Sequence, residues 1–193
     1  MENLQYLVFV GAAVSLVSTF FYIKLILEDK AQPSIVSWFM WFLATFVGSV
    51  ISIYEGGRLS SLPIVVATIV PLLVFIATFY KRNYKFTASN FDYACGILSF
   101  LALVIWLITR ESNFALWLAI IGDFLAAIPT IKNAWLNPEK ESPVPYFGYV
   151  FNQSTTFAAV KIWAFPVYGF SLYLIILNFV IMVLCLRKYL FKK

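Results

Sequence analysis

Seven long apolar runs restrict this chain to a narrow set of folds. Each run has enough residues to cross roughly 30 Å of bilayer hydrocarbon at about 1.5 Å per residue in a helix. Because a spanning segment must satisfy its backbone polar groups internally, we expect each run to be an α-helix. The runs are Leu4–Leu27, Ile35–Tyr54, Leu62–Tyr80, Tyr93–Thr109, Phe114–Ile131, Val144–Trp163 and Val167–Leu186.

The composition supports the same conclusion. Hydrophobic residues make up 62% of the 193 residues, charged residues make up 12%, and the mean hydropathy is +0.88. A soluble core of this length could not bury so much apolar surface. We therefore predict an all-α integral membrane protein with seven transmembrane helices and no separate soluble domain.

Basic residues are distributed unevenly between the two sides of these helices. One side carries Lys24, Lys30, Lys81, Arg82, Lys85, Lys132, Lys140, Arg187, Lys188, Lys192 and Lys193, and the other carries Arg58, Arg110 and Lys161. The positive-inside rule then predicts an outer N-terminus and a cytoplasmic C-terminus, in a plasma membrane of the bacterial inner-membrane type. The net charge of +5 indicates contact with anionic lipid rather than with nucleic acid, since the basic residues are scattered over short loops.

The sequence lacks the patterns that catalysis or metal binding requires. It has no His, no GxSxG or HExxH motif, and no paired carboxylates within an apolar run. Cys95 and Cys185 fall near cytoplasmic, reducing ends of the predicted helices, where neither a disulfide nor a metal site is indicated. We expect no enzyme activity, no cofactor and no metal.

An offset of 108 positions aligns the chain with itself. The offset pairs Ile23 with Ile131, Lys24 with Lys132, Ser34 with Ser142, Val36 with Val144, Phe39 with Phe147, Trp38 with Tyr146, Trp41 with Tyr149 and Ser15 with Asp123. Such duplication is common in transporters. It predicts three-helix units at 1–88 and 112–193, a linker helix within 89–111, and a pseudo-twofold axis along the membrane normal: a 3+1+3 arrangement.

One motif in the second unit resembles a known family. Pro129–Trp135, followed by Ser142–Phe147, looks like the PQ-loop signature of the SWEET, SemiSWEET and PQ-loop transporter superfamily. In that signature a Pro-Gln pair near the cytoplasmic end of a repeat's first helix precedes a basic turn and an aromatic helix start. Tyr22–Lys24 and Gln32–Phe39 form a weaker first copy. The resemblance implies a carrier built from two triple-helix units.

The motif departs from the family at important positions. Thr130 replaces the Gln of the second copy, and Phe21 and Tyr22 stand where the first Pro-Gln pair would be. Asn178 is similar to the pocket asparagine of SWEET proteins. Sugar specificity is not implied by these residues, and a vitamin or amino-acid carrier of the same fold, such as the PnuC type, stays an equal alternative.

Several polar residues fall inside the apolar runs. By residue count Asp123, Asn152, Gln153 and Asn178 lie near the membrane midplane, where polar groups are costly and therefore indicate function. Duplicated carriers bind substrate at this depth between their repeats. We therefore predict a substrate pocket formed by these four residues.

Three further residues complete the predicted pocket. Trp41 lies deeper than an interfacial belt residue should, and Tyr149 is its repeat mate, so the pair is expected to form walls for a ring-shaped cargo. Thr45 adds a hydroxyl from the first unit. Ordinary core packing is the alternative for the two aromatic residues.

Asp123 has two interpretations. It is either a structural acid bonded to a neighbour such as Asn152 or Thr156, or a site for a proton, a cation or a substrate donor. Burial favours the neutral form of a carboxyl group, so we expect Asp123 to release its proton only when the cavity admits water or substrate.

Prolines suggest where a carrier could bend. Pro129 with Thr130, and Pro71, are predicted hinge or gate positions, although proline is also tolerated in membrane helices that do not move. The sequence thus predicts a carrier of a small polar metabolite, such as a sugar, vitamin or amino acid, that works by alternating access, either facilitative or proton-coupled. The alternative is a non-transporting accessory or lipid-sensing scaffold, and self-association into a homo-oligomer stays open.

Overall fold

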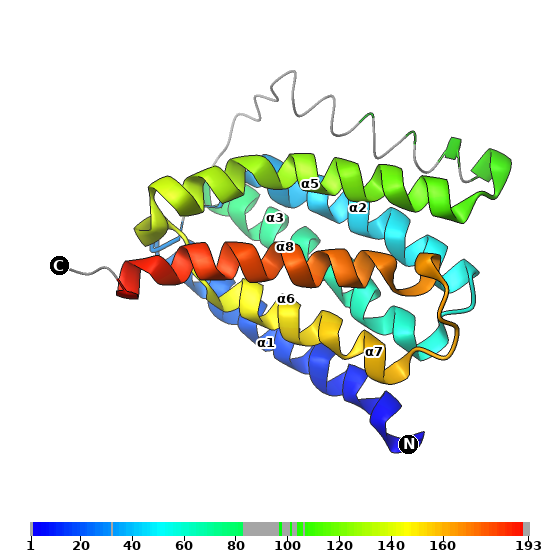
Figure 1. The fold of residues 1–193 in the computed structure, drawn as a ribbon. Coiled ribbons are helices and arrows are strands. Elements are labelled where there is room, and N and C mark those ends of the chain that lie inside the picture. Colours follow the sequence, from blue (N-terminus) through cyan, green and yellow to red (C-terminus); the bar gives the residue numbers. More distant parts are fainter. Residues whose placement is uncertain are drawn as a thin grey trace.

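The chain is all-helical throughout the part that the structure describes. This computed structural model describes residues 2–31, 33–82, 97, 101, 104–105 and 107–190, and it contains no strand among them. The α-helices are α1 (Leu7–Leu27), α2 (Ile35–Tyr54), α3 (Leu62–Arg82), α5 (Ser112–Leu136), α6 (Val144–Ser154), α7 (Thr156–Ala159) and α8 (Phe165–Leu190); the 3-10 helices are η1 (Glu2–Tyr6), η2 (Arg58–Ser61) and η3 (Pro138–Lys140). The prediction of an all-α fold is confirmed for these residues (Figure 1).

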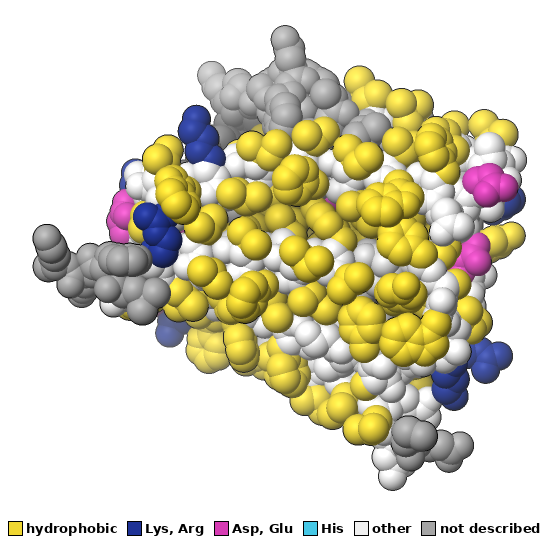
Figure 2. Space-filling view, in the orientation of Figure 1, with side chains coloured by type: hydrophobic (Ala, Val, Ile, Leu, Met, Phe, Trp, Pro, Cys, Tyr) yellow, Lys and Arg dark blue, Asp and Glu magenta, His cyan; other side chains and the backbone are white. Residues whose placement is uncertain are grey.

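Five helices in the described ranges are long and apolar enough to cross a membrane. They are Asn3–Leu27, Ile35–Tyr54, Arg58–Lys81, Ser112–Leu136 and Phe165–Arg187. Figure 2 shows a continuous apolar surface along the helices, with the acidic and basic side chains gathered at the two ends. Both features are compatible with membrane insertion. The predicted helix Tyr93–Thr109 lies mostly outside the described residues.

The predicted single helix Val144–Trp163 differs from the structure. It divides into α6 and α7 at Thr155, and α7 ends at Ala159. At the break the Thr155 hydroxyl donates to Asn152 O at 2.6 Å, and the Thr155 N–H also bonds to this oxygen, three residues back rather than four. Hydroxyl groups that bond to nearby carbonyl oxygens compete with the regular helical ladder. The polar stretch therefore tightens and interrupts the helix.

The described helices pack into two groups with the same internal arrangement. In one group α3 lies between α1 and α2, and in the other α8 lies between α5 and α6. The groups meet along two seams, where α1 packs on α6 and α2 packs on α5. Six helices thus form a ring in the order α1, α3, α2, α5, α8, α6 (Figure 1).

A hydrogen bond and a cation–π contact identify the helix ends that lie together. Lys81 at the end of α3 donates to Leu27 O at the end of α1 at 2.6 Å, and Arg187 of α8 lies 4.0 Å from the ring centroid of Trp135 near the end of α5. We call this the basic end, because its described residues include Lys24, Lys30, Lys81, Lys132, Lys140 and Arg187.

The other end of the ring holds the starts of α3, α5 and α8. Here Arg110 lies over the Tyr54 ring with 5.4 Å to its centroid, and Ser112 donates to Glu55, so the start of α5 lies beside the end of α2. This opposite end carries Arg58, Arg110 and Lys161. Consequently α3 ends and α5 begins at opposite ends of the ring.

Small residues allow the backbones of α1 and α6 to approach closely. A Cβ added to Gly148 of α6 would overlap Ser18 Oγ and lie 3.3 Å from the Cα of Ser15. A Cβ added to Gly11 of α1 would lie 3.1 Å from the Cα of Asn152. Such close approach is the usual basis of helix association in membranes, where no hydrophobic driving force acts between helices.

We predict that Gly148→Ala destabilises the seam. The added methyl group must displace Ser18, and overpacking of this kind costs about 1–3 kcal/mol. The free energy of unfolding in a mixed-micelle denaturant titration measures the loss. A second substitution, Ser18→Gly, removes the clashing group and should restore part of the lost free energy of unfolding. An unchanged stability of Gly148→Ala would mean that the two backbones are further apart than described.

Candidate functional site

A small enclosed cavity lies inside the ring, between the two helix groups. Its lining residues come from five helices and are Trp41, Thr45, Ala67, Pro71, Asp123, Tyr149, Leu174, Leu177 and Asn178. The space open to water centres is about 10 Å³, which is about the room that one water molecule needs. In this conformation the cavity is closed and too small for a metabolite.

Most of the residues predicted for the site meet at this cavity. Trp41 and Thr45 reach it from α2, and Tyr149 reaches it from α6. Asp123 lies on α5 and Asn178 on α8. Positions that are more than a hundred residues apart in the sequence are thus brought together. The predicted hinge residue Pro71 also lines the cavity, from α3.

Asp123 is fully buried and has one hydrogen-bond partner. Its Oδ2 accepts from the Tyr173 hydroxyl at 2.8 Å, and its Oδ1 has no partner. The expected neighbours Asn152 and Thr156 bond elsewhere, and Thr156 bonds to Ser171 Oγ at 3.2 Å. Tyr173 was not predicted, because only the packing of α8 on α5 brings its hydroxyl to the carboxyl group.

Two hydrogen-bond donors at the cavity also lack partners. The indole Nε1 of Trp41 and the hydroxyl of Tyr149 are buried and unpaired. Each unsatisfied buried polar group costs about 1–3 kcal/mol. Together with Asp123 Oδ1, the residues that line the cavity thus carry one acceptor and two donors without partners. The cavity is therefore suited to a small molecule that both donates and accepts hydrogen bonds.

Pro71 adds a backbone acceptor to this set. Proline has no N–H, so the helical bond from position 71 to Ala67 O cannot form. Both Ala67 and Pro71 line the cavity. The missing bond leaves Ala67 O without its usual helical donor, although α3 continues through Pro71.

Asn152 and Gln153 lie outside the cavity, which differs from the prediction. Both are fully buried, and their side-chain amides donate to Pro63 O at 3.0 and 2.9 Å. They attach the break between α6 and α7 to the first turn of α3. Residue counting placed them at a similar depth to Asp123. Their side chains, however, point toward the first turn of α3 and therefore do not line the cavity.

The second predicted hinge is also away from the cavity. Pro129 is exposed, and α5 continues through it to Leu136. The neighbouring Thr130 is 3% exposed, and its hydroxyl has no partner. The pair lies about one turn before Lys132, toward the basic end of α5.

The basic end contains a second buried acid that the sequence did not reveal. Glu141 is 3% exposed, and its Oε1 accepts from the Tyr22 hydroxyl at 2.6 Å. Tyr22 packs on Trp38, with 5.6 Å between ring centroids, and Trp38 packs edge-on against Trp41 at 5.1 Å. These rings form an aromatic column, Tyr22, Trp38 and Trp41, from Glu141 to the cavity. In the sequence Glu141 follows Glu139 and Lys140, and it resembles an ordinary solvated turn residue.

Comparisons of the chain with protein-family models, curated proteins and solved structures found no match. Within the described ranges, no three His, Cys, Asp or Glu side chains gather where they could hold a metal ion. Function is therefore inferred from the chemistry of the cavity itself.

We predict that Tyr173→Phe destabilises the protein through Asp123. The change keeps the ring and removes the hydroxyl, so neither oxygen of the carboxyl group would retain a partner. A buried acceptor left unsatisfied costs about 1–3 kcal/mol. The loss should shrink in the Asp123→Leu background, where no acceptor remains, and a double-mutant cycle of unfolding free energies measures this coupling.

Tyr168→Phe is the matched control on the same helix. Tyr168 packs against Phe165 and Trp163 and does not touch Asp123. Its substitution should leave the stability within about 0.5 kcal/mol of the original. Equal effects of the two substitutions would show that the Tyr173 hydroxyl does not support Asp123.

Proposed function

We propose that this protein is a membrane carrier for a small polar solute. The solute binds in the cavity at Asp123 and crosses the membrane by alternating access between the two helix groups. The observation that carries the proposal is the cavity itself, because it lies between the groups and its lining residues include Trp41, Asp123 and Tyr149, each of which has a buried polar atom without a partner. Binding between duplicated units is the usual arrangement in such carriers.

The packing of the helices supports a duplicated architecture of the 3+1+3 type. Each group has its third helix between its first two, and the seam of α1 with α6 has a counterpart in the seam of α2 with α5. The repeat mates Trp41 and Tyr149 both line the cavity. Since α3 ends and α5 begins at opposite ends, we propose that residues 89–111 provide the linker helix. This arrangement agrees with the resemblance to the SWEET and PQ-loop superfamily.

The orientation follows from the charges at the two ends. We propose that the basic end faces the cytoplasm and that Arg58, Arg110 and Lys161 face outward, in a plasma membrane. The N-terminus is then outside. The aromatic column and the Glu141–Tyr22 bond close the cavity on its cytoplasmic side, and Pro71 and Thr130 are positions where the helices could bend when it opens.

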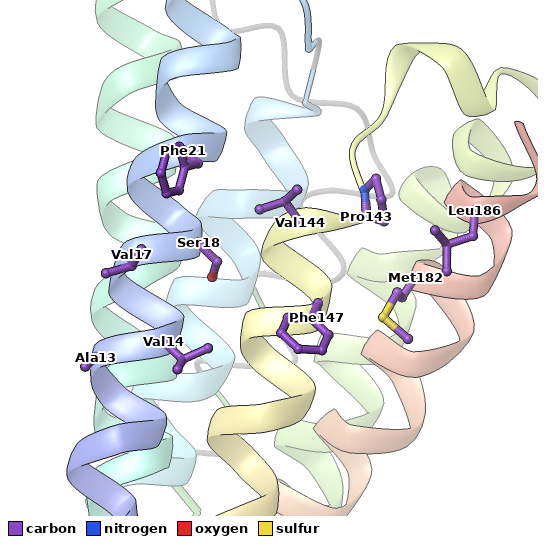
Figure 3. A pocket seen from close by; sticks show the side chains of 10 residues that line it. All are labelled: Ala13, Val14, Val17, Ser18, Phe21, Pro143, Val144, Phe147, Met182 and Leu186. Atoms are coloured by element: carbon purple, nitrogen blue, oxygen red, sulfur yellow. The ribbon is translucent and has the colours of Figure 1, made fainter. Parts of the chain in front are cut away.

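A lipid-binding scaffold is the second candidate, and one groove favours it. The groove lies on the outside of the helix ring, along α1, α6 and α8. Figure 3 shows its apolar side chains, among them Phe21, Phe147 and Met182. It measures about 570 Å³, and Ser18 is its only lining residue with a polar side chain. A scaffold would use this groove and would leave the inner cavity closed.

We predict uptake of a labelled solute into vesicles that contain the purified protein. A panel of sugars, vitamins and amino acids identifies the solute, and empty vesicles give the background rate. The substitution Thr45→Phe places a ring where the closed cavity has room for about one water molecule. A variant that still elutes as a folded protein in size-exclusion chromatography should show no specific uptake. Uptake of the whole panel at the background rate would contradict the carrier and favour the scaffold.

We also predict that transport depends on pH through Asp123. The carboxyl group must exchange its proton when the cavity opens to water, whereas an amide of the same size cannot titrate. Asp123→Asn should therefore give a flat pH profile while keeping the fold, and Asp123→Ala should lose binding. Initial rates across a pH series provide the measurement. A profile unchanged by Asp123→Asn would make Asp123 a structural residue.

A further inference from the structure

Among the described Asp, Glu, Lys and Arg residues, the buried side chains are carboxyl groups. Asp123 is fully buried and Glu141 is 3% exposed, whereas no described Lys or Arg belongs to the buried set. The chain nevertheless carries a net charge of +5. Its described Lys and Arg residues lie at the two ends of the ring, and none of them lines the cavity.

This distribution selects the charge of a bound solute. An anion in the cavity would meet the Asp123 carboxyl group with no basic side chain among the lining residues to offset it. A cation would neutralise the same group, and charges interact far more strongly in a dry interior than in water. A neutral polyol could hydrogen-bond to Asp123 but could not compensate its charge.

The remaining lining groups also suit a cation. Trp41 and Tyr149 present aromatic rings at the cavity, and the faces of such rings attract ammonium groups. The unpaired Nε1 of Trp41 and hydroxyl of Tyr149 require an acceptor on the solute.

We infer that the solute is a small organic cation, an amine or ammonium compound that also carries a hydrogen-bond acceptor. Its ammonium group donates to Asp123 Oδ1, and its acceptor receives the Trp41 Nε1–H or the Tyr149 hydroxyl. This assignment rests on the proposed carrier function and names its substrate class.

The second buried acid extends this assignment to the path at the basic end. The aromatic column of Tyr22, Trp38 and Trp41 joins the cavity to Glu141. A cation that leaves Asp123 toward the basic end would meet a second buried carboxyl group there, that of Glu141. The path thus offers cation-binding groups at both of its ends.

Three probes of similar size separate the charge of a solute from its shape. Ethanolamine is a cation with a hydroxyl acceptor, ethylene glycol is its neutral analogue, and glycolate is an anion. Each is added at millimolar concentration and fixed ionic strength to the purified full chain in detergent, and binding is followed by thermal stabilisation. We expect ethanolamine to bind at least about tenfold more tightly than the other two, as a charge-assisted hydrogen bond implies.

Two acid-to-amide variants locate the effect. Asp123→Asn removes the buried charge and should abolish the preference for ethanolamine, whereas Glu139→Gln changes an exposed acid in the turn before α6 and should preserve it. Tighter binding of ethylene glycol or glycolate, equal binding of all three, or no binding of ethanolamine would overturn the inference. So would a preference that survives Asp123→Asn.

Vesicle uptake distinguishes failure of the inference from failure of the carrier proposal. If a neutral or anionic solute is transported and Thr45→Phe abolishes this transport, the carrier stands and the cation assignment is wrong. If ethanolamine binds with the expected dependence on Asp123 but no solute is taken up, the site binds cations and the carrier proposal fails.

Discussion

The structure depends on keeping one carboxyl group away from water at the centre of a helix ring. Asp123 has no exposed surface and makes a single hydrogen bond, to Tyr173. A buried, half-satisfied acid costs several kcal/mol unless a proton, a cation or a hydrogen-bond donor compensates it. The residues that line the cavity include two with unpaired donors, Trp41 and Tyr149, and no basic side chain.

The helix packing explains how such a group can be buried and still be reached. In the seam between α1 and α6, Gly11 and Gly148 allow the two helix backbones to approach closely. The cavity lies between the groups, where a relative rotation would open it without breaking the contacts inside either one. The break at Thr155, tied to α3 through Asn152 and Gln153, divides the run Val144–Trp163, which was predicted as a single helix.

The sequence was sufficient to predict several residues that meet at the cavity, but not the residues that form hydrogen bonds with them or with the aromatic column. Asp123, Trp41 and Tyr149 could be predicted, because membrane depth and the offset of 108 positions are one-dimensional properties of the chain. Tyr173 and Glu141 could not be predicted, because their hydrogen bonds to Asp123 and Tyr22 depend on which helix faces pack together. For the same reason Asn152 and Gln153 were wrongly predicted to line the cavity. Their depth along the helix could be counted from the sequence, but the direction of their side chains toward α3 could not. Among the described residues the apolar runs predicted the helices well, and the competition between side-chain and backbone hydrogen bonds at Thr155 interrupted one of them.

If the protein is a carrier, the closed cavity opens in turn to the two sides of the membrane. The most direct test is the reaction of a cysteine at Thr45 with a membrane-impermeant thiol reagent, in sealed vesicles that contain the full chain with Cys95 and Cys185 replaced by Ala. Phe46→Cys, on the exposed face of the same helix, is the control that lipid should protect. The account predicts that Thr45→Cys reacts from either side and that a bound solute slows the reaction, whereas Phe46→Cys stays unreactive. Protection of Thr45→Cys from both sides, with and without solute, would contradict it.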